Sequence, residues 1–62
     1  MLVTLTEYSF GQTGDIVVNM DMVAYMNLSP NGGTRIYYGN NSFVEVTEDL
    51  VTIYSKFKNS RW

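Results

Sequence analysis

The chain has 62 residues, enough for one domain and not for a second. It contains no cysteine and no histidine, which excludes disulfides and thiolate metal sites and removes the commonest general base. The net charge is −2, and Arg35 is the only cation up to Asp49, so the body of the chain lacks the clustered cations that a dominant phosphate-binding surface needs.

Two antiparallel strands are predicted in the first third of the chain. Residues 1–10 are rich in Thr, Val, Leu and aromatic residues, which favour strands. Their apolar side chains alternate, and three of them share one side: Met1, Val3 and Leu5. The segment 11–14 has a glycine at each end and predicts the turn, so that a second strand at 16–19 returns beside the first.

The middle of the chain predicts an antiparallel meander of three strands, at 23–28, 34–38 and 42–46. The turn at 29–33 carries the strongest signal, because proline fixes φ and the Asn-Gly pair after it tolerates the left-handed region. A second turn is predicted at 39–41, which reads Gly-Asn-Asn. Tight turns of this kind place strands beside their neighbours along the chain.

The spacing of apolar residues changes after residue 46 and predicts a helix at about 48–58. Thr47 suits the N-cap, and Glu48 and Asp49 would lie in the first turn, where the helix dipole favours acidic side chains. Four apolar residues recur at helical spacing: Leu50, Ile53, Tyr54 and Phe57. A helix this short is marginal in water, so we expect this stripe to pack on the sheet or a partner. The predicted fold is one domain over 1–62, mainly β with one C-terminal helix, in the order β-β-β-β-β-α.

No constellation of residues predicts catalysis, a cofactor or a metal. The glycines at 32–33 belong to a hairpin turn rather than a phosphate-binding loop, and no Ser or Lys has an obvious activating base. Glu48 and Asp49 are near Glu45 in sequence, but a helix start explains them better than a metal site does. Spacing alone leaves a carboxylate pair for glycoside chemistry open, although a chain of this size rarely encloses a substrate cleft. We therefore expect no enzyme.

Arg35 and Tyr37 are the candidate interaction residues. Side chains two apart on a strand share a face, so Arg35 and Tyr37 point one way and Thr34, Ile36 and Tyr38 point the other. We expect the second group to face the core. An exposed arginine beside a tyrosine is typical of protein interfaces, and the same pair also suits stacking on nucleic-acid bases. A strand register shifted by one residue would instead bury Tyr37 and expose Tyr38.

The end of the chain forms a basic tail with an aromatic terminus: Lys56, Lys58, Arg61 and Trp62. These residues are candidates for contact with a partner or with phosphates. Cations in the last turn of a helix also complement its dipole without any ligand.

The stretch 16–50 carries an ordered pattern of apolar, acidic, aromatic and turn residues that ends at a helix start. Its positions are Ile16-Val17-Val18-Asn19, Asp21, Met22-Val23, Tyr25, Pro30, Thr34 to Tyr38, Gly39, Phe43-Val44 and Thr47. In this pattern the chain resembles the small flagellar proteins of the FlbD type and, more loosely, the first half of LytTR-type DNA-binding domains. The resemblance implies a small bacterial or phage accessory protein with no catalytic residues. Val46 stands where the family often carries an acidic residue, and the turn at 11–14 also departs from the family.

These observations predict a non-enzymatic accessory or regulatory module that acts through protein contacts. A domain of this size buries only about 60% of the surface that its unfolded chain exposes, so we expect a homo-oligomer. The start of the chain does not look like a secretory signal, no apolar run is long enough for membrane insertion, and a cytoplasmic location is expected. The alternative is a small nucleic-acid-binding or transcription-associated module that uses Arg35, Tyr37 and the basic tail.

Overall fold

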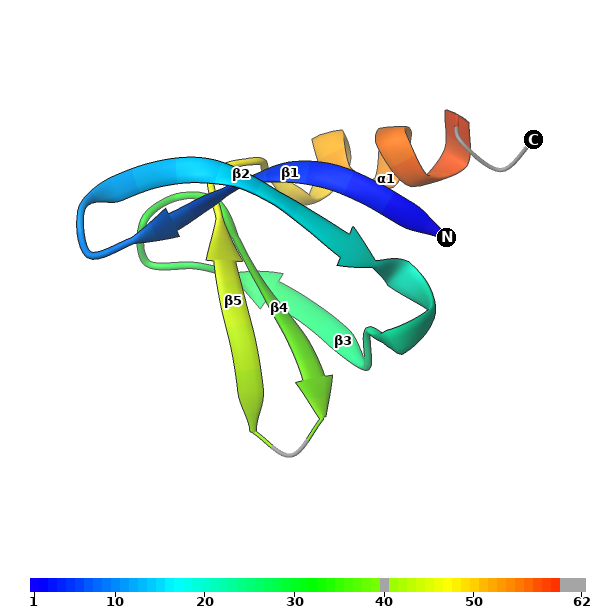
Figure 1. Cartoon of the computed structure of the whole chain (residues 1–62), viewed down its shortest axis with the longest axis horizontal. Helices are drawn as coiled ribbons and strands as arrows, with labels where there is room; N and C mark the ends of the chain where they lie inside the picture. The colour runs from blue at the N-terminus through cyan, green and yellow to red at the C-terminus, as the bar shows by residue number, and fades with distance from the viewer. Residues whose placement is uncertain (40, 60–62) are drawn as a thin grey trace.

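The computed structural model describes residues 1–39 and 41–59, which form one antiparallel sheet and a C-terminal helix (Figure 1). The elements in chain order are β1 (Leu2–Ser9), β2 (Gln12–Asn19), the 3₁₀ helix η1 (Met20–Met22), β3 (Tyr25–Leu28), β4 (Thr34–Gly39), β5 (Ser42–Val46) and α1 (Leu50–Asn59). The strands lie in the order β2-β1-β5-β4-β3. The predicted fold class, five antiparallel strands followed by one helix, is confirmed.

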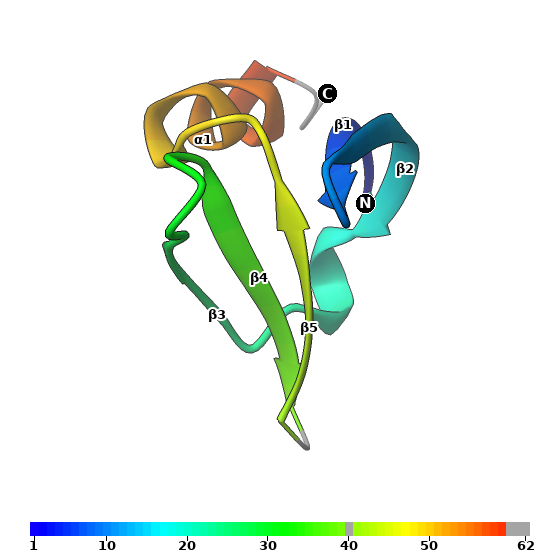
Figure 2. The ribbon, with the colours of Figure 1, turned by 90° about the vertical axis from the view of Figure 1, so that its left-hand side faces the viewer.

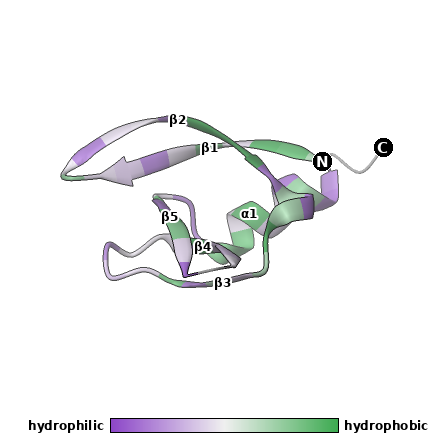
Figure 3. Cartoon of the chain, turned by 60° about the horizontal axis from the view of Figure 1, so that its bottom comes forward, coloured by the Kyte–Doolittle hydropathy of each residue, from purple (hydrophilic) through white to green (hydrophobic). Residues whose placement is uncertain are grey.

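The sheet is divided into a hairpin and a meander. β1 and β2 pair along the full eight residues of each strand, and β3, β4 and β5 form the predicted meander. In the part of the chain that the structure describes, β1 and β5 share one opposed pair, Glu7 with Val46. Because the pairing between the two parts is so short, the hairpin crosses over the meander as a second layer, with α1 at one end (Figures 2 and 3).

The core lies between these two layers. Six apolar side chains are buried there, from β1, β2, β4, β5 and α1: Val3, Leu5, Val18, Ile36, Val46 and Ile53. The alternation predicted for the first strand is confirmed, since Val3 and Leu5 point inward while Leu2 and Thr4 are exposed. Among the described residues, every buried side-chain nitrogen and oxygen has a hydrogen-bond partner.

The first turn differs from the prediction. The chain reverses at Phe10 and Gly11, whose φ angles of 51° and 79° are both positive, and β2 begins at Gln12 rather than at residue 16. A two-residue turn with positive φ at both positions matches the right-handed twist of the paired strands. Gly14, expected in the turn, therefore pairs within the hairpin opposite Glu7.

The third strand also starts later than predicted, at Tyr25 rather than at residue 23. Residues 20–22 form η1, which the sequence pattern does not predict. Asn19 caps this turn, because its Oδ1 accepts a hydrogen bond of 3.1 Å from the N–H of Asp21. The cap redirects the chain from the hairpin into the meander.

The helix begins at Leu50, two residues later than predicted. Thr47 therefore lies too far before the helix to be its cap. Its N–H donates to the carbonyl oxygen of Thr6 at 2.9 Å and continues the seam between β5 and β1. Asp49 takes the capping role, since its Oδ1 accepts from the N–H of Thr52 at 2.8 Å.

The apolar stripe of α1 is covered only in part. Ile53 is fully buried, whereas Leu50 and Tyr54 remain 42% and 63% exposed. The sheet therefore covers Ile53 but not the whole stripe, which the prediction assigned to the sheet or a partner. The helix lies across one end of the two layers and touches β1 and β3, so only its inner edge reaches the core (Figure 2).

Candidate interaction face

The outer face of the meander presents three aromatic side chains, here called the aromatic face: Tyr25 on β3, Tyr37 on β4 and Phe43 on β5. Alternation along β4 places Tyr37 and Arg35 on this face, while Thr34 and Ile36 are fully buried on the other. The predicted division of β4 into two faces is confirmed for these four residues.

Tyr38 differs in part from its expected place. The sequence predicts that it shares the core side of β4 with Ile36, but Tyr38 is 37% exposed. Tyr38 is the second-last residue of β4. The end of the β4–β5 hairpin extends beyond the β1–β2 hairpin (Figure 2). Partial burial, and secondarily the negative charge of Glu7, raise the pKa of the Tyr38 hydroxyl.

The three rings of the aromatic face form a ladder across the strands. Tyr25 lies opposite Tyr37, and Tyr37 lies opposite Phe43. The two tyrosine rings are stacked, with centroids 4.5 Å apart and planes at 16°, and the Tyr37 and Phe43 rings are 5.2 Å apart and tilted by 40°. Directly opposed aromatic pairs of this kind stabilise a sheet and fix the position of each ring. Tyr25 and Phe43 remain 53% and 42% exposed, so the ladder also offers its surface to solvent.

Arg35 is held in place by the neighbouring strand. Its Nε lies 2.9 Å from Oε2 of Glu45, directly opposite on β5, and its guanidinium lies 4.8 Å from the centre of the Phe43 ring. The hydrogen bond to Glu45, followed by one to Tyr37, raises the pKa of Arg35. The sequence alone offers no partner for Arg35 within its own strand. The structure supplies one, so Arg35 is a neutralised and oriented group rather than a free cation.

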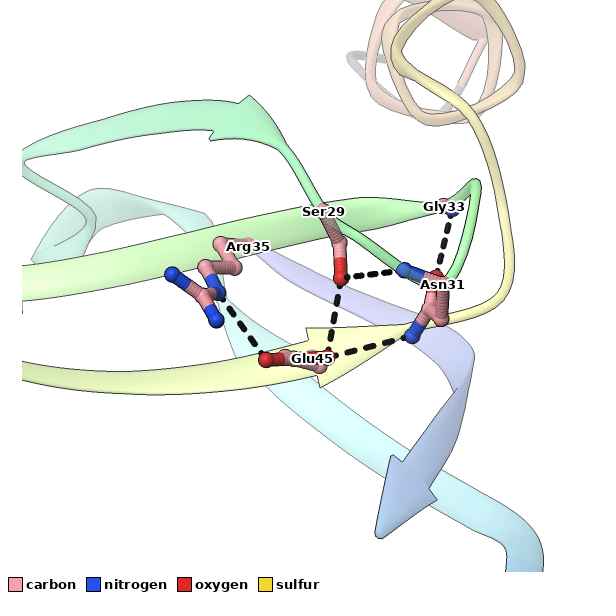
Figure 4. Close-up of polar contacts among 5 residues, drawn as sticks. All are labelled: Ser29, Asn31, Gly33, Arg35 and Glu45. Carbon is pink, nitrogen blue, oxygen red and sulfur yellow. Dashed lines mark hydrogen bonds and ion pairs between the residues drawn. The ribbon is translucent and has the colours of Figure 1, made fainter. Parts of the chain in front are cut away.

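Glu45 joins the aromatic face to the turn between β3 and β4 (Figure 4). Its Oε1 accepts hydrogen bonds from Ser29 Oγ at 2.8 Å and from Asn31 Nδ2 at 3.2 Å. Asn31 Oδ1 in turn accepts from the N–H of Gly33 at 2.6 Å. The bond from Ser29, and then the bond from Arg35, lower the pKa of the Glu45 carboxyl. The network holds the turn, β4 and β5 in one arrangement.

The basic tail is placed only in part. Lys56 and Lys58 lie in the last turn of α1, as predicted, and Lys56 lines a shallow depression together with Leu2 and Thr4 of β1. This depression lies on the hairpin and helix rather than on the aromatic face. The remaining candidates, Arg61 and Trp62, lie outside the described residues. The structure thus brings Arg35 and Tyr37 together and does not join the described lysines to them.

The sequence pattern identified Arg35 and Tyr37 but did not place other residues beside them. These are the two further rings of the aromatic face, Tyr25 and Phe43, and the residues of the hydrogen-bond network, Ser29, Asn31 and Glu45. The signal that links them is the pairing register of the meander, which opposes Arg35 to Glu45. Within residues 1–39 and 41–59 no three acidic side chains approach one another closely enough to hold a metal ion. Both oxygens of the Glu45 carboxylate accept hydrogen bonds, Oε1 from Ser29 and Oε2 from Arg35.

Comparisons with known proteins found no matching family model, no matching curated protein and no matching solved structure. The resemblance to FlbD-type proteins therefore stays a prediction. In the described ranges, no helix has the length and apolar character that crossing a membrane requires.

Proposed function

We propose that this chain is a non-enzymatic accessory module that acts through protein contacts and associates with itself, with the aromatic face as its contact surface. The observation that carries the proposal is the ladder of Tyr25, Tyr37 and Phe43, which is ordered by stacking and still about half exposed at both ends. Tyrosine, phenylalanine and arginine are the residues enriched in protein interfaces. Rings already fixed in the free protein lose little conformational entropy when a partner covers them.

The charge of the face favours a protein partner over a nucleic acid. Arg35 is paired with Glu45, so the aromatic face has no net positive charge of its own. Phosphates require several unpaired cations, and the Glu45 carboxylate beside Arg35 repels them. The alternative proposal, a nucleic-acid-binding module, rests on the stacked rings and on the basic tail.

Sedimentation velocity over a range of concentrations tests the proposal. We expect the wild-type chain to sediment above its 7.1 kDa mass at tens of micromolar, and the double variant Tyr25→Ser, Tyr37→Ser to shift toward the monomer. Val17→Ser is the matched control, because Val17 is 59% exposed on β2 and lies off the aromatic face. A clean monomer for the wild type would contradict the proposal.

Retention on heparin distinguishes the nucleic-acid-binding alternative from the proposed protein contact. Binding that weakens steeply as salt rises would favour the nucleic-acid module, whereas indifference to heparin at low salt would leave protein contact as the function.

A further inference from the structure

We infer that two copies of this chain pair antiparallel through the free edges of β3, in the register that places Asn27 opposite Asn27 of the second copy. The inference deepens the proposed function, because it names the partner and the edge at which the aromatic faces of two copies meet.

The main chain of β3 is available on one side. In the described chain its hydrogen-bonded neighbour is β4, and no strand lies beyond it. The N–H of Ser29 donates to the carbonyl of Gly33 at 3.0 Å, which establishes which residues of β3 direct their main-chain groups toward β4. Since antiparallel pairing alternates along a strand, Asn27 directs its main-chain groups toward β4, and Met26 and Leu28 direct theirs outward. These outward groups can bond a further strand.

β3 carries none of the charged or proline side chains that protect edge strands. Soluble proteins protect their sheet edges with charged side chains, prolines or bulges. The four residues of β3 are Tyr, Met, Asn and Leu, with no charge and no proline. The opposite edge of the sheet, β2, carries Asp15, and pairing two copies there at the register centred on Asp15 opposes like charges. The unprotected edge is therefore β3.

Leu28 marks the surface that a second copy would cover. It lies opposite the fully buried Thr34, on the core side of the meander, yet it is 71% exposed. Two positions back, Met26 is half-buried and lines an apolar groove of about 300 Å³ between β3 and α1, together with Ile53 and Tyr54. In the inferred register Leu28 of the second copy lies opposite Met26, on the same face and at this groove.

The register also avoids repulsion between two copies that each carry a net negative charge. It opposes Tyr25 to Ser29 of the second copy and Met26 to Leu28 of the second copy, so no charged residue faces another across the new seam. Each of the two Met26–Leu28 pairs exchanges both main-chain hydrogen bonds, and a two-fold axis between the Asn27 residues makes the pairing closed.

The area is sufficient for a small dimer. Four apolar side chains at this edge and on the adjoining helix are between 42% and 71% exposed: Tyr25 (53%), Leu28 (71%), Leu50 (42%) and Tyr54 (63%). With about 100 Å² from each, together with the strand edge, roughly 600 Å² would be buried per copy, which is the low end for a specific interface. The pairing covers Tyr25 of each copy and places the two aromatic faces side by side across the new seam.

A single cysteine at the two-fold axis tests the pairing directly, because the chain has no other cysteine. Asn27 of each copy would form a non-hydrogen-bonded pair with Cα atoms about 4.5 Å apart, which a disulfide can bridge. In a buffer of oxidised and reduced glutathione, Asn27→Cys should form disulfide-linked dimers about tenfold or more in excess over a matched cysteine elsewhere, since paired thiols have effective concentrations near the millimolar range.

Two matched variants locate the contact. Val17→Cys reports on the β2 edge and Phe43→Cys on the aromatic face; both should form mainly glutathione adducts. A dominant dimer from either one, with none from Asn27→Cys, would overturn β3 pairing. If the dominant dimer comes from Phe43→Cys and the wild type still sediments as an oligomer, the proposed function stands while the pairing fails. If it comes from Val17→Cys, the contact lies off the aromatic face and both fail. If the wild type is monomeric, both fail.

Leu28→Lys gives an independent measure without a cysteine. Leu28 is exposed, so the variant should keep its fold by circular dichroism, and its sedimentation should fall to that of the monomer. Unchanged oligomerisation of Leu28→Lys would overturn the inference.

Discussion

The N–H of Thr6 donates to both carboxylate oxygens of Glu48, at 2.9 and 3.0 Å. Thr6 lies on β1, and its carbonyl oxygen accepts from the N–H of Thr47 just after β5. The Glu48 side chain therefore extends the short seam between the hairpin and the meander by standing in for a main-chain acceptor. It couples the start of α1 to the same seam, because the Glu48 carbonyl accepts from the buried Thr34 hydroxyl at 2.8 Å.

Glu48→Ala should lower the free energy of unfolding by about 1.5–3 kcal/mol, because it leaves the partly buried N–H of Thr6 without its acceptor. Glu48→Gln should cost less, since one amide oxygen can still accept. Urea denaturation measures both. Asp15→Asn, a change of an exposed carboxylate on β2, is the control and should be nearly neutral. Equal losses of unfolding free energy in Glu48→Ala and Asp15→Asn would contradict the role of Glu48 in the seam.

Gly33 is required because the start of β4 closely approaches the end of β5. A Cβ at this position would overlap the carbonyl oxygen of Val46 and lie 2.9 Å from the carbonyl carbon of Thr47. Gly33→Ala should therefore displace β5 from the start of β4 and destabilise the fold by about 2 kcal/mol or more. Gly14→Ala is the matched control, because its Cβ meets open space. Thermal melts of the two variants should differ clearly; two similar melts would contradict the close approach.

Ile53 is expected to anchor the helix. It is fully buried, so Ile53→Ala should cost about 2–5 kcal/mol, which is much of the stability of a small domain. Leu50 is 42% exposed, so Leu50→Ala should cost roughly 1 kcal/mol or less. The stability losses of Ile53→Ala and Leu50→Ala are compared through denaturant midpoints, measured at a concentration where the chain is monomeric. A larger loss for Leu50→Ala would mean that the helix is turned relative to the sheet.

Local patterns were sufficient to predict most of the elements. Alternation identified the inward face of β1 through Val3 and Leu5, and the Pro-Asn-Gly-Gly turn separated β3 from β4. The errors fall where tertiary contact decides a boundary. Thr47 is a good N-cap by residue type, but the Thr47 N–H and the Glu48 carboxylate both bond to Thr6 of β1, so residues 47 and 48 stay in the seam and the helix starts later. Helical spacing likewise predicts a stripe and cannot say how much of it the sheet is wide enough to cover.

The composition of the aromatic face could not be predicted from local patterns, because it depends on register. A regular turn that opposes Gly39 to Ser42 would place Arg35 opposite Val46. An irregularity between Tyr37 and Gly39 shifts the pairing by one residue and brings Glu45 opposite Arg35. The two faces of β4 are fixed by alternation alone, which explains why they were predicted while the partner of Arg35 was not.

Acid should weaken the turn between β3 and β4. The folded-state pKa of Glu45 lies below its unfolded value of about 4.3, chiefly because Ser29 donates to the carboxylate and then because Arg35 does. A carboxyl with a lowered pKa stabilises the fold above its unfolded pKa, and this contribution is lost as pH falls through the folded pKa. Stability should therefore decline below about pH 4.3.

The Ser29→Ala variant isolates this effect, because it removes the largest cause of the shift and leaves Arg35 in place. Its denaturant midpoint should be lower than that of the wild type at neutral pH, and the difference should narrow at low pH. Ser55→Ala, at an exposed serine of α1, is the control. A difference between Ser29→Ala and the wild type that stays constant with pH would show that the serine acts through packing alone.

Phe10 occupies an unfavourable position for its residue type. Its φ of 51° lies in the left-handed region, which side chains other than those of Gly, Asn and Asp rarely adopt, and its side chain is fully exposed at the tip of the hairpin. Asn followed by Gly is the preferred sequence for a turn with two positive φ angles. Phe10→Asn should therefore relieve strain without removing a contact and raise the free energy of unfolding by about 1 kcal/mol.

The thermal midpoint of Phe10→Asn should accordingly rise by about 4–8 °C in a domain of this size. The reverse change is available as a control at Asn41, which is exposed with a φ of 63° in the turn before β5. Asn41→Phe should lower the midpoint by a similar amount, because it places a phenylalanine in the same conformation. If Phe10→Asn instead lowers the midpoint while Asn41→Phe behaves as expected, the conformational argument holds and Phe10 must make an apolar contact that outweighs its strain. Repeating the melt at two protein concentrations then assigns that contact, since only a contact between copies depends on concentration.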